Sequence, residues 1–508
     1  MVGGAAKLGL ALLVWEAFSR ISAVGVLIAG PSDIAAYVFQ NAALLGRAAL
    51  ETTTNAALGF VFGNLLALAL AAVVLLVPRS ERVIAPLALI IFSLPLIATG
   101  PILRVLFGPG AGPQITLGAL AVYYTTFLAL LVGLRAVSQG WTDLMRVYGR
   151  GAWTTLVKVR ARASFPYLFV GLQIAAPAAF LGAMIGEFTG AERGLGVLTL
   201  RAMRGLQVDG TWSLALLSAG IAMAAYAAIG RLGKQFYDGP PPLLFFAPVA
   251  AKRRPAALRL LEAVLVAAII VVAWQALMET FDLNRFFAKR PGDVLAYLAQ
   301  PGPRSTLLSA LGETLAFTLP GYLAGLGLGA GLAALLILSP TLERTTLPIA
   351  VALRAVPIIT TAPLLVLAFG RGFVGTVVVV AVMIFFPTLV ACLQGLRQTP
   401  GQVTDVFQSY GAPRWRLLVS AQIPAMLPAF FASARMAVPA ALLAVTTAEW
   451  LATGKGIGVL MAMTASTSDY NMLWSCVAVL GAVAMAFYVL VGMCEQAVLR
   501  RYAPEQVA

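Results

Sequence analysis

The segment DVFQSYGAPRWRLLVSAQIPAMLP, residues 405–428, is polar in a chain that is 60% hydrophobic. Apolar sequence long enough to cross a bilayer lies on both sides of it. Gly411 suits the left-handed end of a helix, and Pro413 suits the first position of a new one. The segment therefore predicts two short helices, at an angle to each other, that interrupt a membrane protein.

The composition of the whole chain indicates a polytopic membrane protein. Of its 508 residues only 11% are charged, and the mean hydropathy is +0.92. A membrane-spanning helix needs about 20 mostly apolar residues. We therefore expect an all-α protein with about twelve transmembrane helices, near 8–29, 54–77, 84–107, 114–136, 168–190, 212–232, 260–280, 314–338, 346–370, 373–395, 430–453 and 473–494.

The net charge of +15 predicts topology rather than nucleic-acid binding. With the N-terminus inside, about 22 of the 35 Lys and Arg residues fall in cytoplasmic segments, as the positive-inside rule requires. Both termini are then cytoplasmic, and the first apolar run is an uncleaved span. The chain has no histidine, and its three cysteines match no metal spacing, so we expect no metal or cofactor. The cysteines are expected to be buried free thiols.

The chain is an internal duplication with an offset of 262 residues. Six spans in each copy imply parallel repeats, related by an axis along the membrane normal. We predict a first repeat at 1–230, a cytoplasmic linker at 231–259 and a second repeat at 260–508. The matches that decide this fall on Pro, Gly, Trp and charged residues, for example Glu51-Thr52 on Glu313-Thr314, Gly59 and Gly63 on Gly321 and Gly325, Gly133-Leu134-Arg135 on Gly395-Leu396-Arg397, Glu187 on Glu449, and Trp212 on Trp474.

The opening segment has a counterpart in the first repeat, DLMRVYGRGAWTTLVKVRARASFP at 143–166. Both copies lie between the fourth and fifth spans of their repeat, on the cytoplasmic side. In the second copy Trp415, Leu418 and Val419 have the spacing of one helix face. That face must pack on its own bundle, on the bilayer surface or on another protein. The first copy differs because it carries a basic run: Lys158, Arg160 and Arg162.

These features resemble the permeases of ATP-binding-cassette (ABC) importers. An acid, a glycine six residues later and an apolar-Pro pair thirteen residues after the glycine are similar to the EAA loop of that family. VWEAF (14–18), GEFTGAERGLGVL (186–198) and AEWLATGKGIGVL (448–460) resemble its nitrate/sulfonate/taurine branch. The resemblance implies the type I importer permease fold and loops that dock on an ATPase, through Asp143, Tyr148, Gly149, Trp153, Leu156, Asp405, Tyr410, Gly411, Trp415 and Leu418.

Further residues are predicted to serve transport, each with a structural alternative. Charged and hydroxyl groups near the membrane predict a substrate path at Glu187, Glu449, Thr361 and Thr446; the carboxylates could instead be helix-end groups satisfied by neighbours. The glycines of the outer loops, Gly194, Gly196, Gly456 and Gly458, either cap helices or meet a binding protein. Close helix packing is predicted at four glycines, Gly59, Gly63, Gly321 and Gly325. An ion pair is predicted between Glu16 and Arg20.

The resemblance implies a fused permease subunit of an importer in the bacterial inner membrane. Its partners would be membrane lipid, two ABC ATPase subunits, as a homodimer, and a periplasmic or lipid-anchored substrate-binding protein. ATP and Mg would bind the ATPase subunits. This chain would bind no cofactor, because Gly454-Lys455 lacks the flanking residues of a phosphate loop. The substrate would be a small solute, anionic or heterocyclic. The alternative is an ion-coupled secondary carrier, which also has 6+6 parallel repeats.

Overall fold

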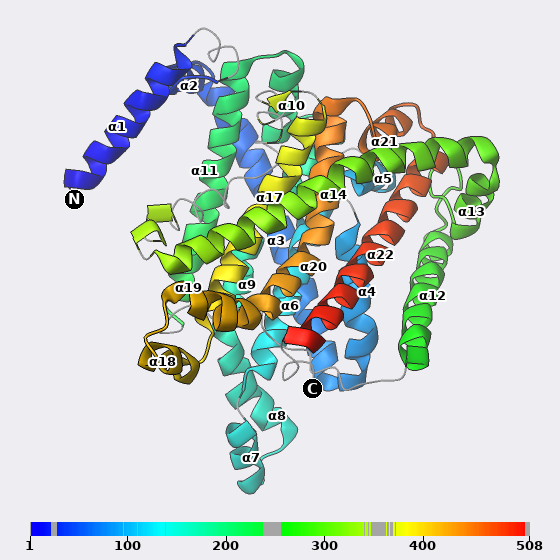
Figure 1. Cartoon of the computed structure of the whole chain (residues 1–508). Helices are drawn as coiled ribbons and strands as arrows, with labels where there is room; N and C mark the ends of the chain where they lie inside the picture. The colour runs from blue at the N-terminus through cyan, green and yellow to red at the C-terminus, as the bar shows by residue number, and fades with distance from the viewer. Residues whose placement is uncertain are drawn as a thin grey trace.

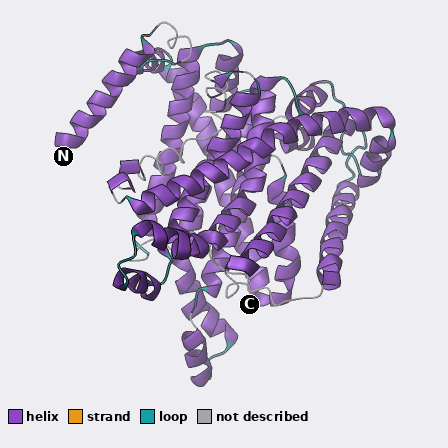
Figure 2. Ribbon diagram, in the orientation of Figure 1, coloured by secondary structure: helices purple, strands orange, loops and turns teal. Residues whose placement is uncertain are grey.

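A computed structural model describes residues 2–21, 28–236 except 95, 109 and 138, 256–339, 341–343, 345–346, 362, 365, 369–370 and 372–502. Every regular element in this part of the chain is a helix (Figure 2). The helices form one bundle, with α1 standing away from it and α12 along its opposite edge (Figure 1). The prediction of an all-α protein is confirmed.

The described helices of the second repeat follow the same order as their counterparts in the first, and the counterparts of α4 and α5 lie mostly outside the described residues. The first has α1 (Val2–Ser19), α2 (Pro31–Gln40), α3 (Ala42–Leu76), α4 (Glu81–Ser93), α5 (Leu96–Phe107), α6 (Gly112–Arg135), α7 (Gln139–Val147), α8 (Ala152–Thr155), α9 (Ala161–Phe188), α10 (Leu195–Arg204) and α11 (Val208–Gly233). The second has α12 (Ala256–Thr280), α13 (Pro291–Ala299), α14 (Pro301–Leu338), α17 (Phe373–Arg397), α18 (Gly401–Ser409), α19 (Arg414–Leu417), α20 (Ile423–Ala448), α21 (Ile457–Ser466) and α22 (Tyr470–Tyr502).

Eight helices of the described residues are long and apolar enough to cross a membrane, and shorter apolar helices accompany them. Each repeat contributes four, which match at the 262-residue offset. They are Ala42–Leu76, Gly112–Arg135, Trp153–Phe188, Val208–Gly233, Pro301–Leu338, Phe373–Arg397, Arg414–Ala448 and Tyr470–Tyr502. Most of the predicted span 346–370, and the linker between residues 237 and 255, lie outside the described residues.

The predicted continuous span at 84–107 is wrong. The chain breaks there into α4 and α5, because Leu94 has the extended backbone of φ −65° and ψ 131°. Pro86 and Pro101 lie inside the two short helices and remove backbone hydrogen-bond donors from them. Two helices of 13 and 12 residues replace one span.

Glycines bring the paired spans of each repeat into close contact. A Cβ at Gly59 would lie 2.8 Å from the Ile115 carbonyl oxygen, and one at Gly325 would lie 2.7 Å from that of Ala381. These distances are too short for a side chain, so α3 packs directly on α6 and α14 on α17. The predicted close packing is confirmed in both repeats.

Matched side-chain contacts confirm the duplication. The Trp15 and Trp212 rings lie 6.0 Å apart between α1 and α11, and Trp274 and Trp474 lie 5.3 Å apart between α12 and α22. Ion pairs also join Arg135 to Glu81 in the first repeat and Arg397 to Glu343 in the second. The Glu16–Arg20 ion pair, at 2.6 Å, is present as predicted.

The repeats meet mainly through α4 and α5 of the first, which contact α20 and α22 of the second. Arg435 of α20 lies 3.2 Å from the Glu495 carboxylate and over the Tyr488 ring, beside Tyr124 of the first repeat. The cysteine prediction holds for Cys392 and Cys476, whereas Cys494 on α22 is exposed. No metal-binding group of His, Cys, Asp or Glu occurs among the described residues.

Candidate functional site

The two loops between the fourth and fifth predicted spans have the same backbone. In each, a short helix, α7 or α18, ends at a glycine with φ +63°, Gly149 or Gly411. The Gly411 amide donates to the Gln408 carbonyl and the Ala412 amide to that of Phe407, both at 2.9 Å. The first loop makes the corresponding two bonds, also at 2.9 Å. This is the Schellman arrangement, so the predicted glycine cap is confirmed in both copies.

The second predicted short helix is instead the start of a span. Pro413 is the N-cap rather than the first helical residue, and α19 runs into α20 through a π-helical turn, Leu418–Gln422 (η3). The first repeat has the same turn at Leu156–Arg160 (η2). Because its sequence has Arg162 where the second has Pro424, this proline is not the cause of the turn.

Each loop exposes an apolar surface made of five matched side chains. Trp153 is 69% exposed and Trp415 is 57% exposed. We name these two sets the first and second coupling surfaces. They are Trp141, Leu144, Tyr148, Trp153 and Val157 in the first, and Val403, Val406, Tyr410, Trp415 and Val419 in the second.

The spacing predicted that Leu418 shares the exposed face of Trp415 and Val419. In the structure it does not. It is 6% exposed and packs with Leu389, Leu393 and Met426. The π-helical turn begins at Leu418 and changes the number of residues per turn, so the i, i+3, i+4 spacing no longer defines one face. Leu418 therefore holds the loop to the bundle.

The charges around the two surfaces differ. Asp143 pairs with Arg146 at 3.0 Å in the first loop, and the Arg416 guanidinium lies over the Trp415 ring in the second. Between residues 139 and 162 the sequence has five basic residues, but between 401 and 424 only Arg414 and Arg416; each stretch has one acid, Asp143 or Asp405. The first surface is therefore the more basic.

At the opposite end of the bundle, Glu187 closes a buried hydrogen-bond network. Glu187 is 1% exposed. Its carboxylate accepts from the Thr52 hydroxyl and from the Gly196 amide, both at 2.7 Å. The Thr52 oxygen in turn accepts from the Leu195 amide at 2.8 Å. This network, the first latch, ties the end of α9 and the start of α10 to α3.

The second repeat has an equivalent second latch around Glu449. Its carboxylate accepts from the Gly458 amide at 2.8 Å, and the Thr314 oxygen accepts from the Ile457 amide at 2.9 Å. The neighbouring acid Glu313 also takes part, accepting from the Gly456 amide at 2.9 Å. The second latch ties the start of α21 to α14 and to the π-helical turn that follows α20, Glu449–Thr453.

The first glycine of each outer loop packs against its latch carboxylate. Gly194 has φ +129° and Gly456 has φ +92°. A Cβ at Gly194 would overlap the Glu187 carboxyl group, and one at Gly456 would overlap that of Glu449. The structure thus brings the predicted glycines and carboxylates together, which their separate predicted roles did not anticipate.

Other predicted residues have different surroundings. The Thr446 hydroxyl is buried and donates to the Leu442 carbonyl at 2.7 Å, while Thr361 lies outside the described residues. A substrate path through Glu187, Glu449, Thr361 and Thr446 stays a prediction. Sequence reasoning missed Thr52 and Thr314, although both belong to the duplicated Glu-Thr pairs.

Comparison with known proteins identifies the two halves. A family described as "Binding-protein-dependent transport system inner membrane component" matches residues 21–236 and 325–503, which is most of the chain. A "Probable ABC transporter permease protein" of Haemophilus influenzae is 29% identical over 229 residues, 45% of this chain and 94% of the relative. That relative therefore corresponds to about one repeat.

Two further relatives have more specific names. The taurine transport system permease of Escherichia coli is 25% identical over 244 residues, 47% of this chain and 86% of the relative. The formylaminopyrimidine transport permease of Halalkalibacterium halodurans is 33% identical over 154 residues, 30% of this chain and 62% of the relative.

Such permeases are transport subunits, and their ATPase and substrate-binding partners are separate proteins. The family assignment supports an ABC importer permease over an ion-coupled secondary carrier. The chain belongs to the binding-protein-dependent transport system inner membrane components and is a tandem, multi-pass permease of an ABC importer.

Proposed function

We propose that this permease couples to two ATPase subunits through its two coupling surfaces. The observation that carries the proposal is the match of five exposed apolar side chains at equivalent positions of both loops. Exposed aromatic and aliphatic groups in an aqueous loop are stabilised when a partner covers them. Two such surfaces, at the same end of the bundle (Figure 1), fit a partner with twofold symmetry, such as an ATPase homodimer.

The surfaces face the cytoplasm in this proposal, and both termini lie on the same side of a bacterial inner membrane. The excess of Lys and Arg in the segments at that end supports this orientation. ATP and Mg would bind the ATPase subunits, whose closure would draw α7 and α18 together and shift the bundle between two arrangements. A periplasmic or lipid-anchored binding protein would then meet the latch end, near α10 and α21.

The proposed substrate is a small solute, anionic or heterocyclic. The names of two relatives, a taurine permease and a formylaminopyrimidine permease, support this range. The interface of α4 and α5 with α20 and α22 is the proposed route, because rearrangement of the two repeats would open it at either end.

Uptake by proteoliposomes containing the chain, its ATPase subunits and its binding protein tests the proposal. We expect uptake that requires ATP and is lost when Trp153→Ala and Trp415→Ala are combined. The control is Phe39→Ala, which truncates an 85% exposed aromatic on α2, away from the loops. Uptake driven by an ion gradient without ATP would refute the proposal.

A further inference from the structure

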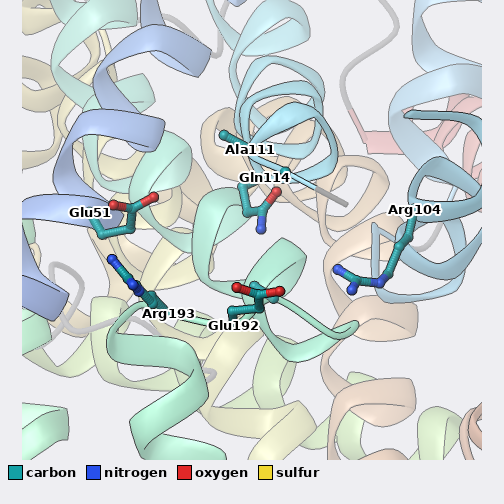
Figure 3. Close-up of a pocket in the computed structure, with 8 residues that line it drawn as sticks. Glu51, Arg104, Ala111, Gln114, Glu192 and Arg193 are labelled. Carbon is teal, nitrogen blue, oxygen red and sulfur yellow. The ribbon is translucent and has the colours of Figure 1, made fainter. Parts of the chain in front are cut away.

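A polar pocket of about 360 Å³ lies beside the first latch and has no described role. Four charged side chains and Gln114 line it (Figure 3). Glu51 and Arg193 lie on one side and Arg104 on the other, with Glu192 and Gln114 between them. This volume is within the range of small-molecule sites in proteins.

The four charged side chains have no ion-pair or hydrogen-bond partner among the residues that the structure describes. Within the described residues, no hydrogen bond or ion pair joins the side chains of Glu51, Arg104, Glu192 and Arg193 to each other or to a neighbour. Two cations and two anions around one cavity can each hold a group of opposite charge. The pocket therefore suits a ligand that carries both signs.

Gln114 adds a buried polar group directed into the pocket. It is 4% exposed, and its hydrogen-bond network assigns the amide nitrogen as donor to the Gly110 carbonyl, at 2.9 Å, and to that of Ala111. This orientation is opposite to the one drawn in Figure 3. These two bonds hold the Gln114 side chain against the loop before α6.

The second repeat uses the equivalent residues differently. Glu313, the counterpart of Glu51, accepts from the Gly456 amide, so its carboxylate is occupied. Thr376, the counterpart of Gln114, has a shorter side chain whose hydroxyl donates to the Gly372 carbonyl. Val366 and Gly454 replace Arg104 and Glu192. The charges at Arg104 and Glu192 are therefore special to the first repeat. Those at Glu51 and Arg193 recur as Glu313 and Lys455.

The position of the pocket places it next to the interface between the repeats. Arg104 is on α5, which also contacts α20, α21 and α22 of the second repeat. The start of α6, at Gly112, faces the same pocket and adds the positive end of a helix dipole. A ligand here would lie at the latch end of the proposed route.

We infer that this pocket is an entry subsite for a small zwitterion, with an anionic group facing Arg193 (Figure 3). An ammonium group would face Glu192, which lies between Arg193 and Arg104 (Figure 3). The inference rests on the proposed transport function, because an entry subsite has a role only in a transporter. The binding itself needs neither an ATPase nor a binding protein.

The test measures ligand binding to the full chain in lipid nanodiscs by isothermal titration. Taurine is the probe because it carries an ammonium and a sulfonate; ethanesulfonate and ethanolamine each lack one of them. We expect taurine to bind at least tenfold more tightly than either analogue. Arg193→Gln and Glu192→Gln should each weaken taurine binding at least fivefold, and Arg193→Lys should retain most of it.

Lys455→Gln is the matched control, because Lys455 is the counterpart of Arg193 in the second repeat. It should bind taurine as the unmodified chain does. Equal taurine affinity for Arg193→Gln and the unmodified chain, or no taurine binding at all, would overturn the inference. So would loss of binding-protein association, rather than of taurine binding, in Arg193→Gln. ATP-driven uptake persisting beside any of these results would leave the transport proposal intact.

Discussion

The two coupling loops have the same backbone but differ in charge. Both cap their first helix at a glycine with φ +63°, both contain a π-helical turn, and both expose five matched apolar side chains. The first loop has five basic residues where the second has two. The two loops thus keep the same backbone and apolar surface although their charges differ. The charge can therefore change how strongly each loop binds its partner.

Truncating the aromatic side chain at the centre of each coupling surface should have the largest effect. We expect Trp153→Ala or Trp415→Ala to cost about 2 kcal/mol or more in ATPase binding, roughly 30-fold, as for buried aromatic groups at other interfaces. Titration of the ATPase onto nanodiscs measures this. Phe39→Ala should leave the affinity for the ATPase unchanged. Unchanged affinity in both tryptophan variants would show that these surfaces do not bind the ATPase.

Replacing the latch carboxylates should produce the next largest effect, on stability rather than coupling. Glu187→Gln loses a charge-assisted acceptor for Thr52 and Gly196, at a cost of about 1–3 kcal/mol in the free energy of unfolding. Glu449→Gln should destabilise its own repeat in the same direction. Thermal unfolding in detergent tests both, against Asp282→Asn in an exposed turn. Unaltered melting of Glu187→Gln would argue against a structural latch.

The glycine caps should respond equally in the two loops. A Cβ at Gly149 or Gly411 meets no atom within 4 Å, so Gly→Ala adds only the strain of a left-handed backbone, about 1–2 kcal/mol. Limited proteolysis at the loops should show equal loosening. Gly401→Ala, which also meets no atom within 4 Å and lacks positive φ, is the control. Unequal loosening would show that the loop backbones are not equivalent.

The charge difference should give the smallest effect, and it should appear as salt dependence. In a Trp415→Ala background, binding depends on the first surface, and rising salt should weaken it about threefold because exposed charges contribute up to about 1 kcal/mol. Adding Lys158→Gln and Arg162→Gln should remove this dependence. In a Trp153→Ala background the dependence should be weaker. Equal salt dependence in both backgrounds would show that the basic run has no part in docking.

The features that followed from the sequence were those set by single residue types. Glycine caps, glycine packing and the duplication follow from residues whose backbone or size requirements do not depend on distant neighbours. The π-helical turns were not predictable, because Pro413, Pro424 and Pro428 suggested helix ends and no local signal indicates a widened turn. The prediction that Leu418 lies on the exposed face was wrong because it assumed a regular α-helix where the π-helical turn occurs.

The latches needed tertiary information for a similar reason. Glu187 and Thr52 are 135 residues apart in the chain, so the sequence showed only that each recurs at the offset. Their duplicated spacing was visible, but the hydrogen bond between them was not. Arg104 and Glu192 could not be found from the duplication, because their charges do not recur in the second repeat.

Hydrogen–deuterium exchange of the nanodisc-embedded chain, with and without its ATPase subunit, tests the central claim most directly. If both coupling surfaces dock, amides in 139–162 and 401–424 should both become protected when the ATPase binds. Segments at the latch end, such as 194–204 and 456–466, should exchange as before. An ATPase that binds without protecting either loop would contradict the account.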